Sequence, residues 1–199
     1  MKNAKCLITA MRATMLALAC LLANPSWAIM LTLEPSNQIG MPGDSVFLDL
    51  TISGLGVGTA PSLGAFDVAF TFDDFALDFV GLGFGEELGI IGLGEAIFGS
   101  NSGVGAIDLF EVSLLTASEL DSQSDTFVLA TLEFLVVNLD PGMLTAVDFS
   151  NIVLSDAFGN ALNADGFGAI IENSQPMPEP ATLALLGLGL AGLGFVRRY

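Results

Sequence analysis

Carboxylates are the side chains of this sequence with the clearest capacity for chemistry. Asp73 and Asp74 are adjacent, and Asp78 follows four residues later. Carboxylate oxygens are preferred ligands of Ca²⁺, so these three residues are a candidate calcium site. The stretch contains no EF-hand loop, and a plain turn between two strands is the alternative interpretation.

The region 29–175 lacks most other reactive side chains. The chain has no histidine, and its cysteines, Cys6 and Cys20, precede this region. The five basic residues also lie near the ends: Lys2, Lys5, Arg12, Arg197 and Arg198. Without His, Cys or Lys, residues 29–175 contain no ordinary base-activated nucleophile and no usual zinc, copper or haem site. No cofactor other than calcium is therefore suggested, and we expect no catalysis.

The charge of the region 29–175 further limits the classes of partner that it could bind. Every carboxylate except Glu179 lies in the region 29–175, which carries no basic residue. Such a region cannot neutralise phosphates, which argues against nucleic acid and anionic lipid as direct partners. It favours cations or basic proteins, and simple solvation of the outer surface is the alternative interpretation of the charge.

The N-terminus has the parts of a secretory signal peptide. A basic start from Lys2 to Arg12 precedes an apolar run from Ala13 to Ala23. Ser26 and Ala28 then place small residues at the two positions that a signal peptidase recognises. We therefore predict a signal helix within residues 1–28, cleaved after Ala28. A lipoprotein signal at Cys20 is the alternative, although Ala-Leu-Ala is a poor lipobox.

The C-terminus has three parts in a fixed order. Pro178-Glu179-Pro180 precedes an uncharged run from Ala181 to Val196, and Arg197 and Arg198 follow it. As a helix the run would be roughly 24 Å long, which is short for a hydrocarbon layer of roughly 30 Å. The arginines would stay in the cytoplasm. A short transmembrane helix over 181–196 is therefore predicted.

This order of features resembles the PEP-CTERM sorting signal of bacterial surface proteins. The resemblance implies that residues 176–199 are a sorting signal, processed near Pro178-Glu179-Pro180 by an exosortase, a membrane protease-transpeptidase. A plain C-terminal membrane anchor is the alternative.

Between the two ends, apolar residues recur with a period of two. The alternation is clearest over 46–52, 66–72 and 128–136. It predicts strands with one buried and one solvated face, as in antiparallel sheets. Shorter candidates are 29–33, 77–82, 106–112, 146–149, 152–155 and 167–171. We predict an all-β, two-layer antiparallel sandwich of about eight or nine strands, with 81–105 as a long loop and 117–124 as loop or helical turn.

Several motifs of this region also resemble one known family. Pro42-Gly43-Asp44 opens a strand, and the stretch from Leu63 to Asp73 then leads to Leu77–Val80. Later the strand at Phe127–Phe134 precedes a turn at Asp156–Asn160. This order is similar to the cohesin / carbohydrate-binding-module-like family. The resemblance implies a jelly-roll sandwich of nine strands over 29–175 that binds a dockerin-like protein or a sugar without catalysis.

These features together predict an exported, non-catalytic protein of the cell surface or extracellular matrix. It would cross the inner membrane, pass through a membrane-anchored intermediate and bind a protein partner through its sandwich. A carbohydrate-binding module attached to extracellular polysaccharide is the first alternative, although the region lacks the Trp and Tyr rings on which sugars usually stack. A jelly-roll glycosidase with two catalytic carboxylates is the second, although no signature singles out a pair.

Overall fold

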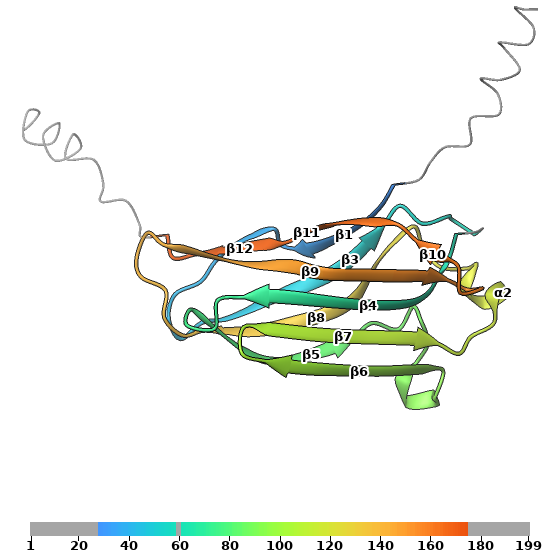
Figure 1. The fold of residues 1–199 in the computed structure, drawn as a ribbon, viewed down its shortest axis with the longest axis horizontal. Coiled ribbons are helices and arrows are strands. Elements are labelled where there is room, and N and C mark those ends of the chain that lie inside the picture. Colours follow the sequence, from blue (N-terminus) through green and yellow to red (C-terminus); the bar gives the residue numbers. More distant parts are fainter. Residues whose placement is uncertain (1–27, 59–60, 175–199) are drawn as a thin grey trace, which may run out of the picture.

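Two packed β-sheets make up the part of the protein that the structure, a computed structural model, describes: residues 28–58 and 61–174 (Figure 1). The first sheet has five strands in the order β11-β1-β3-β8-β5. Their bounds are β1 Ile29–Glu34, β3 Ser45–Ser53, β5 Leu77–Phe84, β8 Thr126–Val136 and β11 Ala164–Phe167.

The second sheet has seven strands, with the main path β2-β12-β9-β4-β7-β6 and β10 paired to β9. Their bounds are β2 Asn37–Ile39, β4 Leu63–Phe72, β6 Ala96–Gly103, β7 Ala106–Ser113, β9 Leu144–Asp156, β10 Ala161–Leu162 and β12 Ala169–Glu172. Two short helices, η1 Ile91–Leu93 and α2 Ala117–Leu120, lie in connections.

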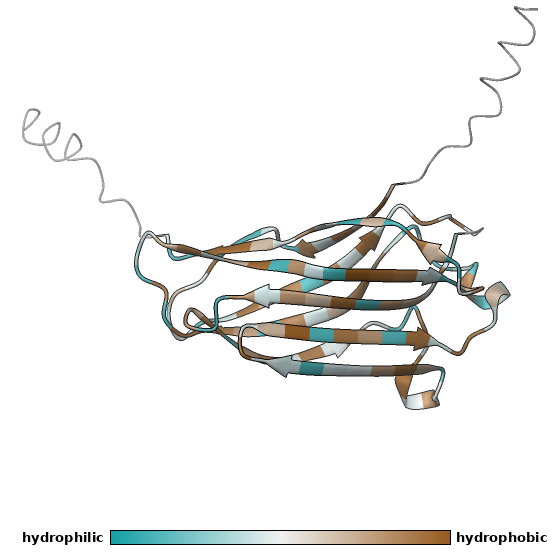
Figure 2. Ribbon diagram, viewed as in Figure 1, coloured by the Kyte–Doolittle hydropathy of each residue, from teal (hydrophilic) through white to brown (hydrophobic). Residues whose placement is uncertain are grey.

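The core between the sheets follows from the alternation in the sequence, which Figure 2 shows as alternating colours along the strands. Leu48 and Leu50 on β3 and Phe66 and Phe70 on β4 are completely or almost completely buried. The ring of Phe134 on β8 packs nearly edge-on against Phe72 and Phe79, with centroids 5.2 and 5.7 Å away. Burial of such side chains is the main stabilising contribution to a sandwich. The predicted two-layer β-sandwich is confirmed.

The strand count and directions differ from the prediction. The described residues form twelve strands instead of about nine, in part because short pieces at the two chain ends also pair. Two of these pairings are parallel, β1 with β11 and β2 with β12, so the sandwich is not purely antiparallel. The two segments expected at 146–149 and 152–155 form one long strand, β9.

The long loop expected over 81–105 is wrong. Residues 81–84 complete β5, and Ala96–Gly103 form β6, which pairs with β7 along its whole length. The residues of β6 are mostly small, and none is charged, so they carry little alternation. The pairing with β7, and not the local sequence, makes this segment a strand. The helical turn considered over 117–124 is present as α2, where Thr116 and Glu119 form a capping box.

The two termini of the described chain leave the sandwich at opposite ends (Figure 1). Ala28 lies beside Gly54, whereas Asn173 donates its backbone N–H to Met143, 3.0 Å away. Within residues 28–58 and 61–174 no helix has the length and apolar character needed to cross a membrane. The expected signal helix within 1–28 falls almost entirely outside the described residues, and the expected helix 181–196 falls wholly outside them.

Candidate functional site

Asp73 and Asp74 of the candidate calcium site lie in the β4–β5 turn and Asp78 lies on β5, but the three carboxylates do not converge. Asp73 Oδ1 accepts a hydrogen bond of 3.0 Å from the backbone N–H of Phe75, and Asp73 lines a hollow with Asn138. Asp74 and Asp78 line a separate hollow beside the β6–β7 hairpin. No group of three metal-ligating side chains occurs among the described residues. Calcium binding at these aspartates stays a prediction.

The residues expected to direct export and sorting are mostly outside the described part of the chain. Ser26, Pro178, Glu179, Pro180, Arg197 and Arg198 all lie there, and Ala28 is exposed just before β1. Cleavage after Ala28 and processing near the Pro-Glu-Pro motif therefore stay predictions.

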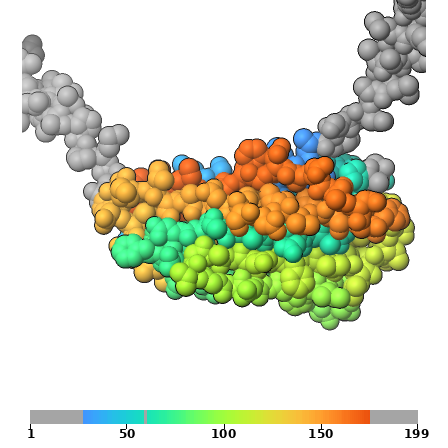
Figure 3. Space-filling model, in the orientation of Figure 1, coloured from blue at the N-terminus to red at the C-terminus, as the bar shows by residue number. Residues whose placement is uncertain are grey.

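A continuous surface with both apolar and acidic side chains is the outer face of four neighbouring strands, β9, β4, β7 and β6 (Figures 1 and 3). It is broad and shallow in the space-filling view (Figure 3). We call it the β4/β7 face. The strand registers place its outward residues in rows across the sheet: Ser155, Ala65, Val112 and Ile97, then Val153, Asp67, Phe110 and Gly99, then Asn151, Ala69, Asp108 and Asn101.

The first two rows of the β4/β7 face are largely apolar. Ile97 and Val153 are 54% and 55% exposed, and Val112 and Phe110 are 40% and 38% exposed. The ring of Phe110 lies over Gly99, where a Cβ atom would meet Phe110 Cε1 at 2.7 Å. Large apolar side chains gathered on one sheet face are typical of a surface that binds a partner.

Carboxylates stand among these apolar residues. Asp67 lies directly between Val153 and Phe110 in its row, and Asp108 lies in the next row. Opposite residues on neighbouring strands have Cβ atoms about 5 Å apart, so Asp67 and Phe110 present one combined surface. No Lys, Arg or His occurs between residues 28 and 174, so no side chain of the body can pair with these charges. The face is therefore apolar and negative together.

The outer face of the five-stranded sheet provides a contrast. Phe47 is 50% exposed there, and its cross-strand neighbour is Glu133. Thr131 donates a hydrogen bond of 2.6 Å to Asp49, so that carboxylate is held within the sheet surface. Asp49 also lies opposite Glu34. This face has scattered apolar residues, and no continuous apolar row like that of the β4/β7 face.

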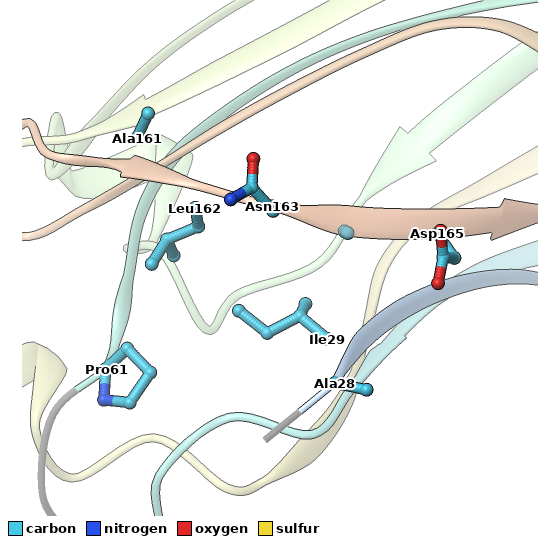
Figure 4. A pocket seen from close by; sticks show the side chains of 8 residues that line it. Ala28, Ile29, Pro61, Ala161, Leu162, Asn163 and Asp165 are labelled. Carbon is cyan, nitrogen blue, oxygen red and sulfur yellow. The ribbon is translucent and has the colours of Figure 1, made fainter. Parts of the chain in front are cut away.

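A hollow of about 470 Å³ lies at the end of the sandwich near Ala28 (Figure 4). Ile29, Pro61 and Leu162 surround it, with Asn163 and Asp165 at its side. It is open to solvent. Its described lining offers one carboxylate and no group suited to nucleophilic or general-acid chemistry beyond it.

Among the described residues, three carboxyl groups have shifted pKa values. Burial raises the pKa of Glu111, on the inner side of β7, from 4.5 to about 7. The Asn160 side chain and three backbone N–H groups bind the Asp156 carboxylate and lower its pKa. The Thr116 hydroxyl and backbone N–H lower the pKa of Glu119 in the same way. The last two groups shape exposed turns, and none of the three lies on the β4/β7 face.

Sequence reasoning did not find the β4/β7 face. Asp67 could be placed on an outward position from its alternation alone, whereas Val153 lies between Ile152 and Leu154 in an apolar run without alternation. Ile97 and Gly99 could not be placed either, because β6 was expected to be loop. The identity of neighbouring strands was also unknown, so residues from 65 to 155 could not be brought onto one surface.

Comparisons with known proteins agree with both halves of the sequence analysis. Residues 178–198 match the family described as the PEP-CTERM protein-sorting motif. No curated protein matches the chain. The fold is similar to that of the sixth cohesin of scaffoldin B from Acetivibrio cellulolyticus, solved with a Cel5 dockerin, with a TM-score of 0.62, 19% identity, and coverage of 73% of this chain and 98% of that one.

Two further solved structures give the same result. CaCohA2 from Clostridium acetobutylicum has a TM-score of 0.59 at 17% identity, covering 73% of this chain and 91% of that one. A non-cellulosomal cohesin from the archaeon Archaeoglobus fulgidus has a TM-score of 0.57 at 12% identity, with 76% and 94% covered. The chain thus joins a PEP-CTERM protein-sorting motif to a β-sandwich with the fold of cohesin domains.

Proposed function

We propose that this protein is an exported, non-catalytic binding module that holds a protein partner on its β4/β7 face. It crosses the inner membrane by the signal peptide 1–28 and is held there by the helix 181–196. An exosortase then processes it near Pro178-Glu179-Pro180 and releases it to the cell surface or extracellular matrix. The match to the sorting motif supports this route, and the cohesin-like fold supports the binding role.

The composition of the β4/β7 face is the observation that carries the binding role. Its core holds Phe110, Val112 and Val153, with Asp67 among them. Apolar side chains supply the area that an association buries, and a carboxylate within that area selects a donor on the partner. A face with one extended apolar row and no deep hollow suits a folded protein better than a small molecule.

The charge of the face specifies the chemistry of the partner. Asp67 and Asp108 have no basic neighbour, because residues 28–174 contain none. The partner should therefore present Lys or Arg beside an apolar patch, and its affinity should fall as salt rises. A dockerin-like domain with such a surface is the occupant that we propose, since several of the similar cohesins were solved in complex with dockerins.

The two alternative functions, a carbohydrate-binding module and a glycosidase, lack comparable support. A sugar-binding face would need aromatic platforms, and the body has no Trp or Tyr, so only Phe rings could serve. A glycosidase would need two carboxyl groups flanking the bond at about 5 to 9.5 Å with a substrate clamp. A screen against common polysaccharides and glycoside substrates tests both, and turnover that depends on one carboxylate pair would favour the glycosidase.

Face-directed substitutions test the binding role. The full chain, purified in mild detergent, serves as bait for the cell-surface fraction, and captured proteins are identified and titrated individually. We expect Phe110→Asp to weaken capture of the partner about tenfold or more, since central aromatic residues dominate binding energy. Phe47→Asp is the matched control, because Phe47 is also an exposed strand phenylalanine (50% against 38% for Phe110) but lies on the opposite sheet. Equal losses in the two variants would contradict the assignment of the face.

The export route has its own test. N-terminal sequencing of the extracellular protein should give Ile29 as the first residue, because cleavage follows Ala28. A lipid-modified Cys20 at the N-terminus would replace this prediction with a lipoprotein route.

A further inference from the structure

Glu111 occupies an unusual position in the sandwich. It lies on β7 between Phe110 and Val112 but faces inward, and its side chain is only 1% exposed. Its cross-strand neighbours are Phe66 on β4 and Phe98 on β6. A carboxyl group thus lies between two aromatic residues in the layer that the core occupies.

The surroundings offer this carboxyl group little compensation. Glu111 Oε1 is buried without a hydrogen-bond partner. Phe84 of the facing sheet packs against both neighbouring rings, with centroids 6.4 Å from Phe66 and 5.3 Å from Phe98. An ionised carboxylate in such a place is strongly destabilising unless a charge partner is present, whereas the protonated form is tolerated.

No titratable group is among the residues that strand pairing and ring contacts place against Glu111, and burial is the one cause that shifts its pKa. Phe66 and Phe98 are its cross-strand neighbours, and Phe84 of β5 packs against both. The nearest acids point elsewhere. Asp67 and Asp108 lie on the outer face, and Glu95 accepts a hydrogen bond of 2.9 Å from the backbone N–H of Ile90.

The strand that carries Glu111 also carries half of the apolar rows on the β4/β7 face. Phe110 and Val112 project outward on either side of it. Among the described strands, β6 is the edge of its sheet and pairs with β7 alone, and it contributes Ile97 to the same face. Phe98, the neighbour of Glu111 on β6, is 45% exposed at this edge. Opening the β6–β7 edge would therefore admit water to an ionised Glu111.

We propose that Glu111 makes the β6–β7 edge a pH-sensitive element: the neutral carboxyl group keeps the edge closed, and its ionisation loosens the edge and the apolar rows above it. The effect on the edge stands independently. The effect on partner binding rests on the proposed function of the β4/β7 face.

The direction of the effect follows from proton linkage. Burial raises the pKa of Glu111 above its ordinary value of 4.5, to about 7, so the folded state binds this proton more tightly than the unfolded chain. The stabilisation from Glu111 is complete below about pH 4.5, is lost as pH rises toward about 7, and changes no further above that. The contribution of Glu111 should therefore make the folded protein more stable in mildly acidic conditions than at pH 8.

A titration of the full chain in mild detergent tests the edge directly. Carbon-13 labelling of glutamate carboxyl groups should reveal one resonance with a midpoint near pH 7, which disappears in Glu111→Gln. If all glutamates titrate below about pH 5.5, the proposal is overturned without reliance on any variant.

Thermal melts provide the second measurement. The melting temperature of the unchanged protein should fall when the pH is raised from 5 to 8. This fall should exceed that of Glu111→Gln, whose side chain cannot ionise, by about 4 °C or more. Glu133→Gln is the matched control, since Glu133 is a half-buried strand residue on the outer face of the other sheet, and it should follow the unchanged protein. Parallel curves for all three proteins would overturn the proposal.

Amide hydrogen exchange separates a local effect from a global one. After correction for intrinsic rates, exchange in β6 and β7 should rise between pH 5 and 8 more than exchange in β3 and β8, and Glu111→Gln should remove the difference. Uniform exchange across both sheets would contradict a loosened edge.

Capture of the partner at pH 6 and 8 then tests whether the edge affects binding. If the edge loosens but capture does not change, the result counts against the proposed face and not against Glu111.

Discussion

The ring of Phe110 on β7 covers Gly99 on the neighbouring strand β6, so closely that a Cβ atom at Gly99 would meet Phe110 Cε1 at 2.7 Å. The orientation of the most prominent aromatic ring on the β4/β7 face thus depends on a glycine at the sheet edge. The local sequence of β6 gives little sign of this role, because its small residues suggest a loop.

We expect Gly99→Ala to displace the Phe110 ring and weaken partner binding several-fold. The cost in stability should be small, because a half-exposed ring can turn toward solvent. Gly103→Ala is the control, since Gly103 is on the same strand and a Cβ atom there meets nothing within 4 Å. Binding titrations with the captured partner and thermal melts measure the two effects. Unchanged binding in Gly99→Ala would show that the ring position is unimportant.

Gln123 is expected to hold the start of β4 to the loops around it. Its buried side chain accepts a hydrogen bond of 2.8 Å from Leu63 N–H, and it donates to Leu63 O at 3.0 Å and Glu87 O at 3.1 Å. Gln123→Ala leaves these buried groups unpaired, so the free energy of unfolding should fall by about 2–3 kcal/mol. Urea unfolding measures it, and Asn151→Ala, at an exposed amide on β9, should change stability by less than about 0.5 kcal/mol.

Acid should weaken the turn at 156–160. Asn160 and backbone N–H groups lower the pKa of Asp156, so this carboxylate contributes stability above its ordinary pKa of 3.8. That contribution is lost as pH falls through the lowered value of the folded state. Asp156→Ala should be less stable at pH 6, and the difference from the unchanged protein should shrink toward pH 2. An acid titration followed by circular dichroism measures both, and a constant difference would contradict the assignment.

The sorting motif should control release from the membrane. Replacing Pro178, Glu179 and Pro180 with alanine should leave the full-length chain in the membrane fraction, because the processing enzyme no longer recognises it. Mass spectrometry should show that the surface form of the unchanged protein lacks Arg197 and Arg198, whereas the variant held in the membrane fraction retains them. Normal processing of the variant would mean that the tail is a plain anchor.

Calcium provides a test of the carboxylates at the β4–β5 turn. Millimolar Ca²⁺ should raise the melting temperature, as salt does for a body whose carboxylates have no basic partner. A site that uses Asp73, Asp74 and Asp78 requires Ca²⁺ to exceed NaCl at equal ionic strength and to lose that advantage in Asp73→Ala. Equal effects of the two salts would leave general screening as the whole explanation.

The sequence by itself determined the sorting motif and the two-layer architecture of this protein. Pro178-Glu179-Pro180 and the arginines after the apolar run are local signals, and the match to residues 178–198 agrees with them. The period-two pattern around Leu48 and Phe66 also determined a β-sandwich, because alternation places every second side chain on a buried face whatever the strand order.

The tertiary structure decided which strands are neighbours, and with them the candidate site. Ala96–Gly103 became a strand through its pairing with β7, a contact between chain segments that no local pattern records. Asp67, Phe110 and Val153 form one row only because β9, β4 and β7 lie side by side. The surroundings of Glu111, on the inner side of the same sheet, could not be predicted from the sequence either. Its place in an alternating strand predicts an inward position, but the phenylalanine rings that desolvate it come from β4, β5 and β6. The β4/β7 face and the buried Glu111 both arise from pairing between strands that are far apart in the sequence. Their neighbours come together only when the chain folds, so the free energy of each cannot be read from a local pattern.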